Sequence, residues 1–160
     1  MDVRLQKKAL VSLAELKSNL RLPASFELYD EDLTMKLQAA VRHAGTFIGR
    51  DLDQVPVISY PFAGSMKLEL DWALQVTAVK VGDTQLEASD WVYSDGTMTI
   101  TGDHSESDVV EVSTEYAPDI KIAVLMHASS IWLSPADSVE NLPKASTNLL
   151  SQYRQYGRRS

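Results

Sequence analysis

Apolar residues near the start of the chain recur with the 3.6-residue period of an amphipathic helix. Ser12 and Glu15 have the spacing of a capping box, in which each side chain accepts a hydrogen bond from the backbone N–H of the other residue. This spacing predicts a short helix that begins at Ser12 and ends before Pro23. A longer helix is predicted from the acidic run 30–32 to Gly49, because acidic residues favour a helix N-terminus and glycine favours a C-cap.

Two more helices are predicted in the last third of the chain. The residues after Pro118 are apolar on nearly every side of a helix that extends as far as Trp132, which is typical of a central core helix or an interface helix. A linker of small and polar residues follows at 134–143. The last helix is short and is predicted over residues 145–153.

Between these helical parts the hydrophobic period changes from 3.6 to 2, which indicates strands. Pro56 and Pro61 break the helical pattern, and an Asp-Gly pair at 95–96 is typical of a tight hairpin turn. The predicted strands cover residues 66–70, 76–81, 91–93, 98–100 and 109–116. Turn residues follow about every ten positions, so we expect a small antiparallel sheet.

These elements predict an α+β fold in a single domain that spans residues 1–160. A mostly helical core of about four helices is expected from residues 1–55 and 118–160. The β-rich segment 56–117 would then be a small antiparallel sheet inserted between the second and third helix. A chain of 160 residues with 44% apolar residues can bury such a core.

Charge is distributed unevenly along the chain, whose formal net charge is −7. Segment 56–117 carries eleven acidic and two basic residues, a net charge of −9, whereas segment 118–160 is at +2 and segment 1–55 is neutral. The acidic segment would repel phosphates, which argues against general nucleic-acid binding there. Basic residues gather instead at the C-terminus, as Arg154, Arg158 and Arg159.

The sequence offers no recognisable catalytic, metal-binding or cofactor-binding motif. It has no cysteine, no nucleophile elbow, no phosphate-binding glycine loop and no dinucleotide fingerprint. We interpret His43, His104 and His127 as core or surface residues, since none has a metal-ligating partner three or four residues away that is also convincingly oriented. The polar run 103–108 lacks the pattern of a calcium loop and is interpreted as a solvated loop.

The large aromatic residues are expected to serve packing. Trp91 and Trp132 are interpreted as core residues, while the role of Trp72 is left open between core and interface. No apolar run approaches the roughly 20 residues that span a bilayer, and the first residues do not form a signal peptide. A soluble cytoplasmic protein without membrane contact is therefore expected.

The helical segments resemble those of tailed-bacteriophage head-tail connector proteins, also called adaptor or head-completion proteins. The resemblance lies in patterns of apolar and turn residues, and segment 56–117 resembles the β-rich insert of one branch, whose members are sometimes described as DNA-packaging proteins. The matching helical segments are residues 9–22, 30–33, 44–50, 118–133 and 149–154.

This resemblance implies a structural role in virion assembly without catalysis or cofactors. Such proteins form a ring, dodecamer-like in the family, beneath the portal protein, extend the DNA channel and dock tail-completion proteins. Assembly would occur in the bacterial host cytoplasm and the ring would remain at the virion head-tail junction. DNA would pass without sequence-specific binding along an acidic surface. The C-terminal segment commonly engages the portal, so the expected contacts are Tyr153, Arg154, Tyr156, Arg158 and Arg159.

Two other classes of function are weighed against the connector. A small DNA-packaging factor would bind nucleic acid through the basic C-terminal tail, the part of the sequence that could supply a basic face. A small enzyme of unrecognised type would need a deep pocket lined by carboxylates or histidine. Salt-dependent binding of DNA would distinguish the first of these, and the shape of the fold the second.

Overall fold

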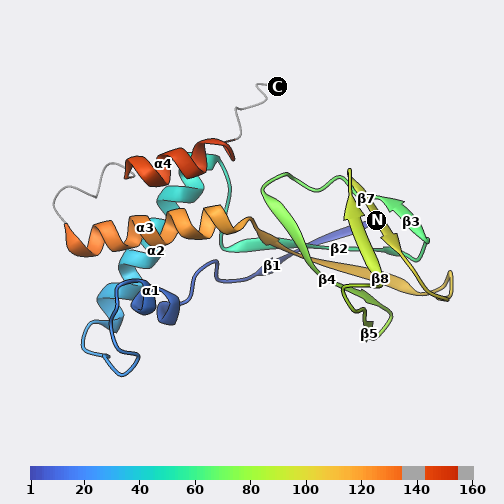
Figure 1. Cartoon of the computed structure of the whole chain (residues 1–160), viewed down its shortest axis with the longest axis horizontal. Coiled ribbons are helices and arrows are strands. Elements are labelled where there is room, and N and C mark those ends of the chain that lie inside the picture. The colour runs from blue at the N-terminus through green and yellow to red at the C-terminus, as the bar shows by residue number, and fades with distance from the viewer. Residues whose placement is uncertain (135–142, 155–160) are drawn as a thin grey trace. The chain divides into compact units, whose positions relative to one another are not determined.

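A computed structural model of the chain describes residues 1–134 and 143–154. It divides the chain into two compact units, each built from two separate segments (Figure 1). Unit 1 combines Met1–Lys7 with Gln54–Tyr116, and unit 2 combines Lys8–Asp53 with Ala117–Ser160. The described residues form four helices and two antiparallel sheets, so the prediction of an α+β fold is confirmed.

Unit 2 contains the helices, and their ends follow the signals in the sequence. The helices are α1 (Leu13–Asn19), α2 (Asp30–Ile48), α3 (Pro118–Leu133) and α4 (Lys144–Ser151). Ser12 and Glu15 form both hydrogen bonds of the predicted capping box. Gly49 ends α2 in the left-handed conformation, with φ 78° and ψ 34°, which glycine adopts without steric strain.

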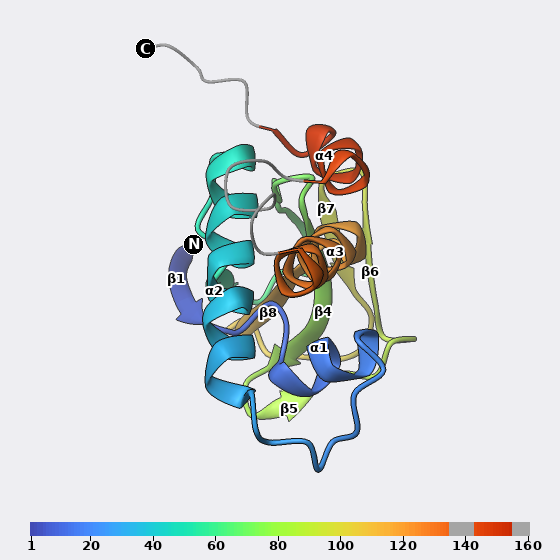
Figure 2. The same cartoon turned by 90° about the vertical axis from the view of Figure 1, so that its left-hand side faces the viewer.

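The core of unit 2 lies where α3 crosses α2, with α4 against α3 (Figure 2). Small residues on both crossing helices are fully buried, as Ala40 and Ala44 on α2 and Ala123 and Ala128 on α3. Side chains of this size let helix axes approach closely. Larger buried side chains fill the space around them, namely Leu33, Leu37, Val41, Ile48, Ile120, Val124, Ile131 and Leu150.

Unit 1 contains a five-stranded antiparallel sheet with strand order β1-β2-β8-β4-β5. A second sheet of three strands has the order β3-β7-β6. The strands are β1 (Asp2–Lys7), β2 (Gln54–Pro61), β3 (Ser65–Lys67), β4 (Leu74–Val81), β5 (Thr84–Gln85), β6 (Trp91–Ser94), β7 (Thr97–Ile100) and β8 (Val109–Tyr116). The predicted hairpin joins β6 and β7, where Asp95 and Gly96 both have positive φ.

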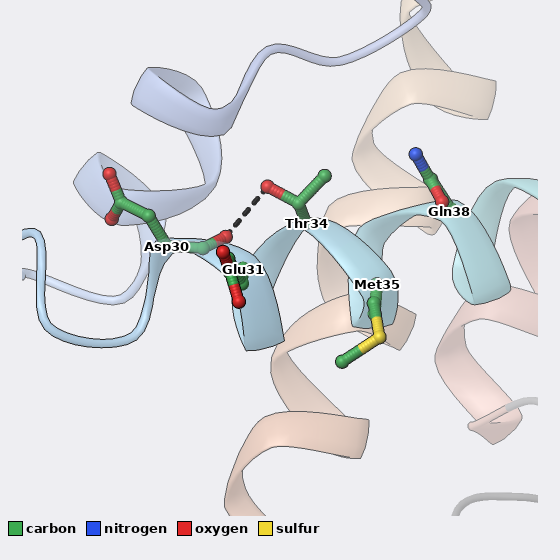
Figure 3. A pocket seen from close by; sticks show the side chains of 5 residues that line it. All are labelled: Asp30, Glu31, Thr34, Met35 and Gln38. Carbon is green, nitrogen blue, oxygen red and sulfur yellow. Dashed lines mark hydrogen bonds between the residues drawn. The ribbon is translucent and has the colours of Figure 1, made fainter.

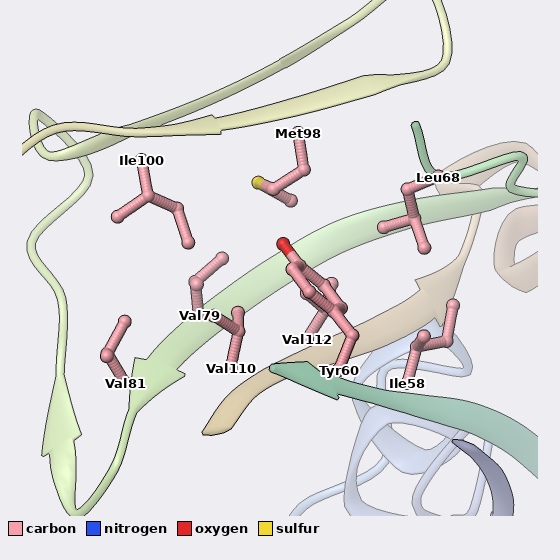
Figure 4. Packing of buried hydrophobic residues seen from close by; sticks show 9 residues of the cluster. All are labelled: Ile58, Tyr60, Leu68, Val79, Val81, Met98, Ile100, Val110 and Val112. Carbon is pink, nitrogen blue, oxygen red and sulfur yellow. The ribbon is translucent and has the colours of Figure 1, made fainter. Parts of the chain in front are cut away.

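Residues from both sheets form one hydrophobic cluster (Figure 4). The side chains alternate along each strand, so the two buried residues that each of β2, β4 and β8 contributes to the cluster are two positions apart. Its buried members are Ile58, Tyr60, Leu68, Val79, Val81, Met98, Ile100, Val110 and Val112. Trp91 is half-buried and packs against this cluster, while Trp72 is 56% exposed.

The chain holds more β structure than the sequence predicted. Strands β1, β2 and β5 were not expected, and the strand predicted over 66–70 is restricted to β3. Strand β1 pairs with β2 along its whole length, from Asp2 opposite Ser59 to Lys7 opposite Gln54. Segment 1–55 is therefore not wholly helical, because its first residues complete the sheet of unit 1.

Candidate functional site

The C-terminal segment, the predicted portal contact, begins at an anchored residue, Tyr153. Tyr153 is 8% exposed, and its hydroxyl donates a hydrogen bond of 3.4 Å to the Oδ2 atom of Asp119, at the start of α3. Burial, and then the Asp119 carboxylate, raises the pKa of the Tyr153 phenol, so the hydroxyl stays protonated and donates. Gln152 donates to the same oxygen at 3.1 Å.

The next residue is held by an aromatic ring of α2. The guanidinium carbon of Arg154 lies 5.2 Å from the ring centre of Phe47, the geometry of a cation–π contact. Tyr156, Arg158 and Arg159 lie outside the described residues. The structure thus brings Tyr153 and Arg154 together against α2 and α3, and both side chains already have contacts within unit 2.

Helix α4 fixes the position of Tyr153 by docking on α3. The Ser146 hydroxyl is buried and donates to the backbone carbonyl of Ala123 at 3.0 Å, and Leu150 is fully buried. Burying a hydroxyl without a hydrogen-bond partner costs about 1–3 kcal/mol, and the bond to Ala123 avoids this cost. The position of Tyr153 is therefore set by α4 packing.

Helix α3 has one buried and one exposed apolar side. Ile122, Met126 and Leu133 are 47%, 36% and 74% exposed. Their spacing of four and seven residues places them on the same face of the helix. The sequence predicted either a core helix or an interface helix, and α3 has the features of both.

Aromatic residues meet at the C-terminal end of α3. Trp132 contacts the ring of Tyr29 edge-on at 5.5 Å, and the Nζ atom of Lys36 lies 5.5 Å from its ring centre. Trp132 is half-buried by these contacts. Tyr29 is 44% exposed. We call Tyr29, Ile122, Met126, Trp132 and Leu133 the α2/α3 apolar surface.

A hollow on the same part of α2 does not have the form of an active site. Its lining residues all come from one helix, so it is open to solvent rather than enclosed (Figure 3). Thr34 uses its hydroxyl to donate to the Asp30 carbonyl at 2.7 Å, as many helical threonines do. The hollow is lined by Asp30, Glu31, Thr34, Met35 and Gln38.

The two histidines of unit 2 form a pair that the sequence did not reveal. The Nδ1 atom of His43 on α2 lies 3.0 Å from the Nε2 atom of His127 on α3. Burial, with a smaller effect from His43, lowers the pKa of His127 to about 4, so His127 is neutral at pH 7. The interpretation of His127 as a core residue is confirmed, because its side chain is fully buried.

This pair does not extend to a metal-binding group among the described residues. No group of three or more histidine, cysteine, aspartate or glutamate side chains within residues 1–134 and 143–154 is placed to hold a metal ion. His104 instead contacts the ring of Phe62 edge-on at 5.1 Å. In the same ranges, no helix is long and apolar enough to cross a bilayer.

The two units differ strongly in charge. Unit 1 contains twelve acidic and four basic residues, a formal net charge of −8. Unit 2 contains ten acidic and eleven basic residues, a net charge of +1. The predicted acidity of segment 56–117 therefore belongs to one compact unit, where it creates a repulsive field for polyanions.

Unit 1 also has an exposed sheet edge. Every residue of β1 is exposed. Among the strands of the described residues, β1 pairs only with β2, so its other side has no neighbouring strand. Val3 is 52% exposed and Leu5 is 66% exposed. An edge strand of this kind presents unpaired backbone N–H and C=O groups to any other strand.

Comparison with known proteins found similarity at the level of structure. No protein-family model matches the chain, and no curated protein matches its sequence. One similar solved chain is described as "Neck of empty GTA particle computed with C6 symmetry"; it is 17% identical, with a TM-score of 0.45, and 94% of this chain and 95% of that chain are covered. A second is described as "Neck of native GTA particle computed with C12 symmetry", with 16% identity, a TM-score of 0.44 and 94% of both chains covered.

Proposed function

We propose that this protein is a structural head-tail connector of a phage or phage-like particle. In this role it forms a ring beneath the portal protein, extends the DNA channel and docks tail-completion proteins, and it performs no chemical step. The proposal rests on the resemblance of its helical segments to connector proteins. The structural observation that carries it is the α2/α3 apolar surface, which offers contact area for protein partners.

This surface has the character of a contact site because three exposed apolar residues lie on one face of α3, and the Trp132–Tyr29 ring pair lies at the C-terminal end of that helix. Burying them against a partner would contribute roughly 25 cal/mol per Å² of apolar area. Trp132 and Tyr29 add rigid aromatic contact area at one end, and such residues are enriched in protein interfaces. The buried side of α3 holds the exposed side in place, so little ordering is needed on binding.

The charge of unit 1 fits a protein that stays near DNA without holding it. With a net charge of −8, unit 1 would repel phosphates and let a duplex pass. A DNA-packaging factor would need a continuous basic surface instead. The basic residues of unit 2 are almost balanced by its acidic ones.

The C-terminal segment is the proposed portal contact. Tyr153 would act as the anchor that fixes where the segment leaves unit 2, since its hydroxyl is bound by Asp119. Arg154, Arg158 and Arg159 would contact the portal, and Tyr156 would add apolar area between them. Arg154 would either keep its Phe47 contact or exchange it for the portal.

The proposal is tested by mixing the purified protein with the portal protein of the same particle. Rings of the protein on one face of the portal, seen by electron microscopy, are the expected result. Replacing Arg154, Arg158 and Arg159 together by alanine should leave the fold intact and abolish ring formation on portals. The matched control replaces Arg42, Lys67 and Lys80 by alanine, which removes the same charge from exposed positions elsewhere.

The outcomes test the role of the C-terminal segment and distinguish the connector from the packaging factor. Rings that persist in the triple arginine variant would overturn the assignment of the C-terminal segment. If wild-type protein neither forms rings nor binds the portal, the connector role is wrong. A shift of DNA mobility that weakens as salt rises, lost in the arginine variant and kept in the control, would instead support the packaging factor.

A further inference from the structure

The five-stranded sheet of unit 1 has two open edges, one at each end. At one end, β1 has no strand on its outer side among the described residues. At the other end, β5 pairs with β4 only at Lys80 and Val81, and the N–H of Leu86 donates to the Val79 carbonyl. Residues 74–78 of β4 therefore face outward without a strand of the described chain beside them.

Apolar residues reach both edges on the same face of the sheet. Paired residues in antiparallel strands share a face, so the pairings define rows that cross the sheet. One row consists of Leu5, Pro56, Thr114 and Val76: Leu5 pairs with Pro56, the Thr114 hydroxyl donates to the Pro56 carbonyl, and Thr114 pairs with Val76. Leu5 at one end of this row is 66% exposed, and Val76 at the other end is half-buried. Both ends of the row thus leave apolar area uncovered.

We propose that β1 of one copy of this protein pairs with the 74–78 edge of β4 in the next copy, so that the sheets of neighbouring copies become continuous. This deepens the ring proposed above and rests on it for the biological setting. The contact joins Leu5 of one copy to the Val76 region of its neighbour. Residues 4–7 of β1 would pair with the open residues 74–78 of β4 in the next copy. The remainder of β4 is already covered by β5.

Strand direction and symmetry agree with this contact. All neighbours in the sheet are antiparallel, so β1 and β4 run in opposite directions and a further β1 placed beside β4 continues the alternation. The two surfaces that meet are different, which makes the contact heterologous. Contacts of this kind repeat from copy to copy and close into rings when the rotation allows, whereas a β1–β1 contact would stop at a dimer.

The 74–78 edge has no charged residue of its own, but β1 and the rest of unit 1 have opposite net charges, which favours this pairing over a contact between two β1 strands. Strand β1 carries Arg4 and Lys7 against Asp2, a net charge of +1. The other segment of unit 1, residues 54–116, carries −9. A basic strand is attracted to the acidic body of the next copy, and two β1 strands repel each other. Arg4 is also held on the sheet by Glu111 at 2.8 Å, which keeps its side chain away from the open edge.

The absence of cysteine from the sequence allows a direct test. In the double variant Leu5→Cys with Val76→Cys, the two sulfurs of one copy are three strand spacings apart, about 14 Å. A disulfide requires Cα atoms within about 7 Å, so oxidation can link only different copies. We expect oxidised, concentrated protein to give a ladder of dimers, trimers and higher oligomers on a non-reducing gel, which a thiol reductant collapses to monomer.

Two controls identify the contact. Gln6→Cys with Val76→Cys carries the same number of thiols on the same strands, but Gln6 is on the opposite face from Leu5, so its ladder should be lost. Leu5→Cys alone should remain monomeric under the same oxidation. Thermal unfolding of each reduced variant verifies that the exposed Leu5 position and the half-buried Val76 position tolerate cysteine.

The results distinguish this contact from the ring itself. Rings of wild-type protein without a ladder in the Leu5→Cys/Val76→Cys variant would overturn the sheet contact and leave the connector role standing. A ladder without rings would support the contact and argue against the connector role. Dimers from Leu5→Cys alone would show a β1–β1 contact and overturn the inference.

Discussion

Gly45 is the position where the structure makes the sharpest prediction about stability. It lies inside α2, four residues before the left-handed Gly49, and its carbonyl accepts hydrogen bonds from the N–H groups of Gly49 and Arg50. The chain turns back over the helix at this point. A Cβ atom on residue 45 would lie 2.5 Å from the backbone oxygen of Arg50 and 3.7 Å from the Cγ atom of Leu52.

Two opposing terms decide the effect of Gly45→Ala. Alanine favours a helix interior by about 1 kcal/mol over glycine. Against this, a methyl group 2.5 Å from a backbone oxygen must displace the turn that caps α2. Overpacking of this kind costs about 1–3 kcal/mol, and each strained capping hydrogen bond adds about 0.5–1.5 kcal/mol. We therefore expect a net loss of roughly 1–5 kcal/mol in the free energy of unfolding, despite the better helix former.

Urea unfolding followed by circular dichroism measures this loss, and Tm should fall by about 2–4 °C per kcal/mol for a chain of this length. Thr46→Ala is the control within α2, because Thr46 is exposed and alanine there should stabilise by a few tenths of a kcal/mol. Gly64→Ala is the control for the change itself, since a Cβ at Gly64 meets nothing within 4 Å. A Gly45→Ala protein as stable as wild type would refute the argument.

Three further changes test other parts of the two units. The pKa of His127 is about 4 in the folded protein, whereas its ordinary value is 6.5. Between these two pH values the unfolded chain binds more protons than the folded protein, so the free energy of unfolding falls as the pH falls from 6.5 to 4. Wild type should lose about 2–3 kcal/mol more than His127→Phe between pH 7 and pH 4.5 in urea titrations; equal losses would contradict the burial of this imidazole. Ser12→Ala removes one half of the capping box and should destabilise by about 1 kcal/mol in the same assay, whereas no change would mean that α1 is held by packing alone. The Tyr60 hydroxyl is buried with no hydrogen-bond partner among the described residues, so Tyr60→Phe should raise the free energy of unfolding by about 1 kcal/mol; a loss would mean that the hydroxyl is satisfied.

Elements whose signals are local could be predicted from the sequence. The long helix α2 has an acidic first turn, a regular apolar face and Gly49 at its end, and the structure has the same limits. The hairpin at Asp95 and Gly96 was equally clear, because the turn requires positive φ at both residues. In each case, neighbouring residues alone decide the conformation.

Elements that depend on distant partners could not be predicted. Strand β1 has six exposed residues, and its pairing with β2 is what makes it a strand. Strand β2 was obscured by Pro56 and Pro61, since proline usually argues against a strand inside a sheet. Here Pro56 offers its carbonyl to the Thr114 hydroxyl at 2.6 Å, so the residue still bonds to β8.

The candidate site was predictable only in part for the same reason. The arginine-rich end of the chain could be recognised from composition, but the contacts of Tyr153 with Asp119 and of Arg154 with Phe47 join residues far apart in sequence. The pairing of His43 with His127 is likewise a product of the crossing between α2 and α3. A single sequence carries no signal for such pairs.

The interleaving of the two units has a consequence for how the chain folds during synthesis. Strand β1 leaves the ribosome before β2, so Lys7 has to wait for Gln54, its partner on β2. At translation rates of about 5–20 residues per second, this wait is roughly 2–10 seconds. Helices α1 and α2 wait longer still, because α3 begins at Pro118. Neither unit can finish folding before part of the other has been synthesised. The nascent chain therefore keeps β1 and the apolar side of α2 uncovered at the same time, and in this period it is most exposed to aggregation.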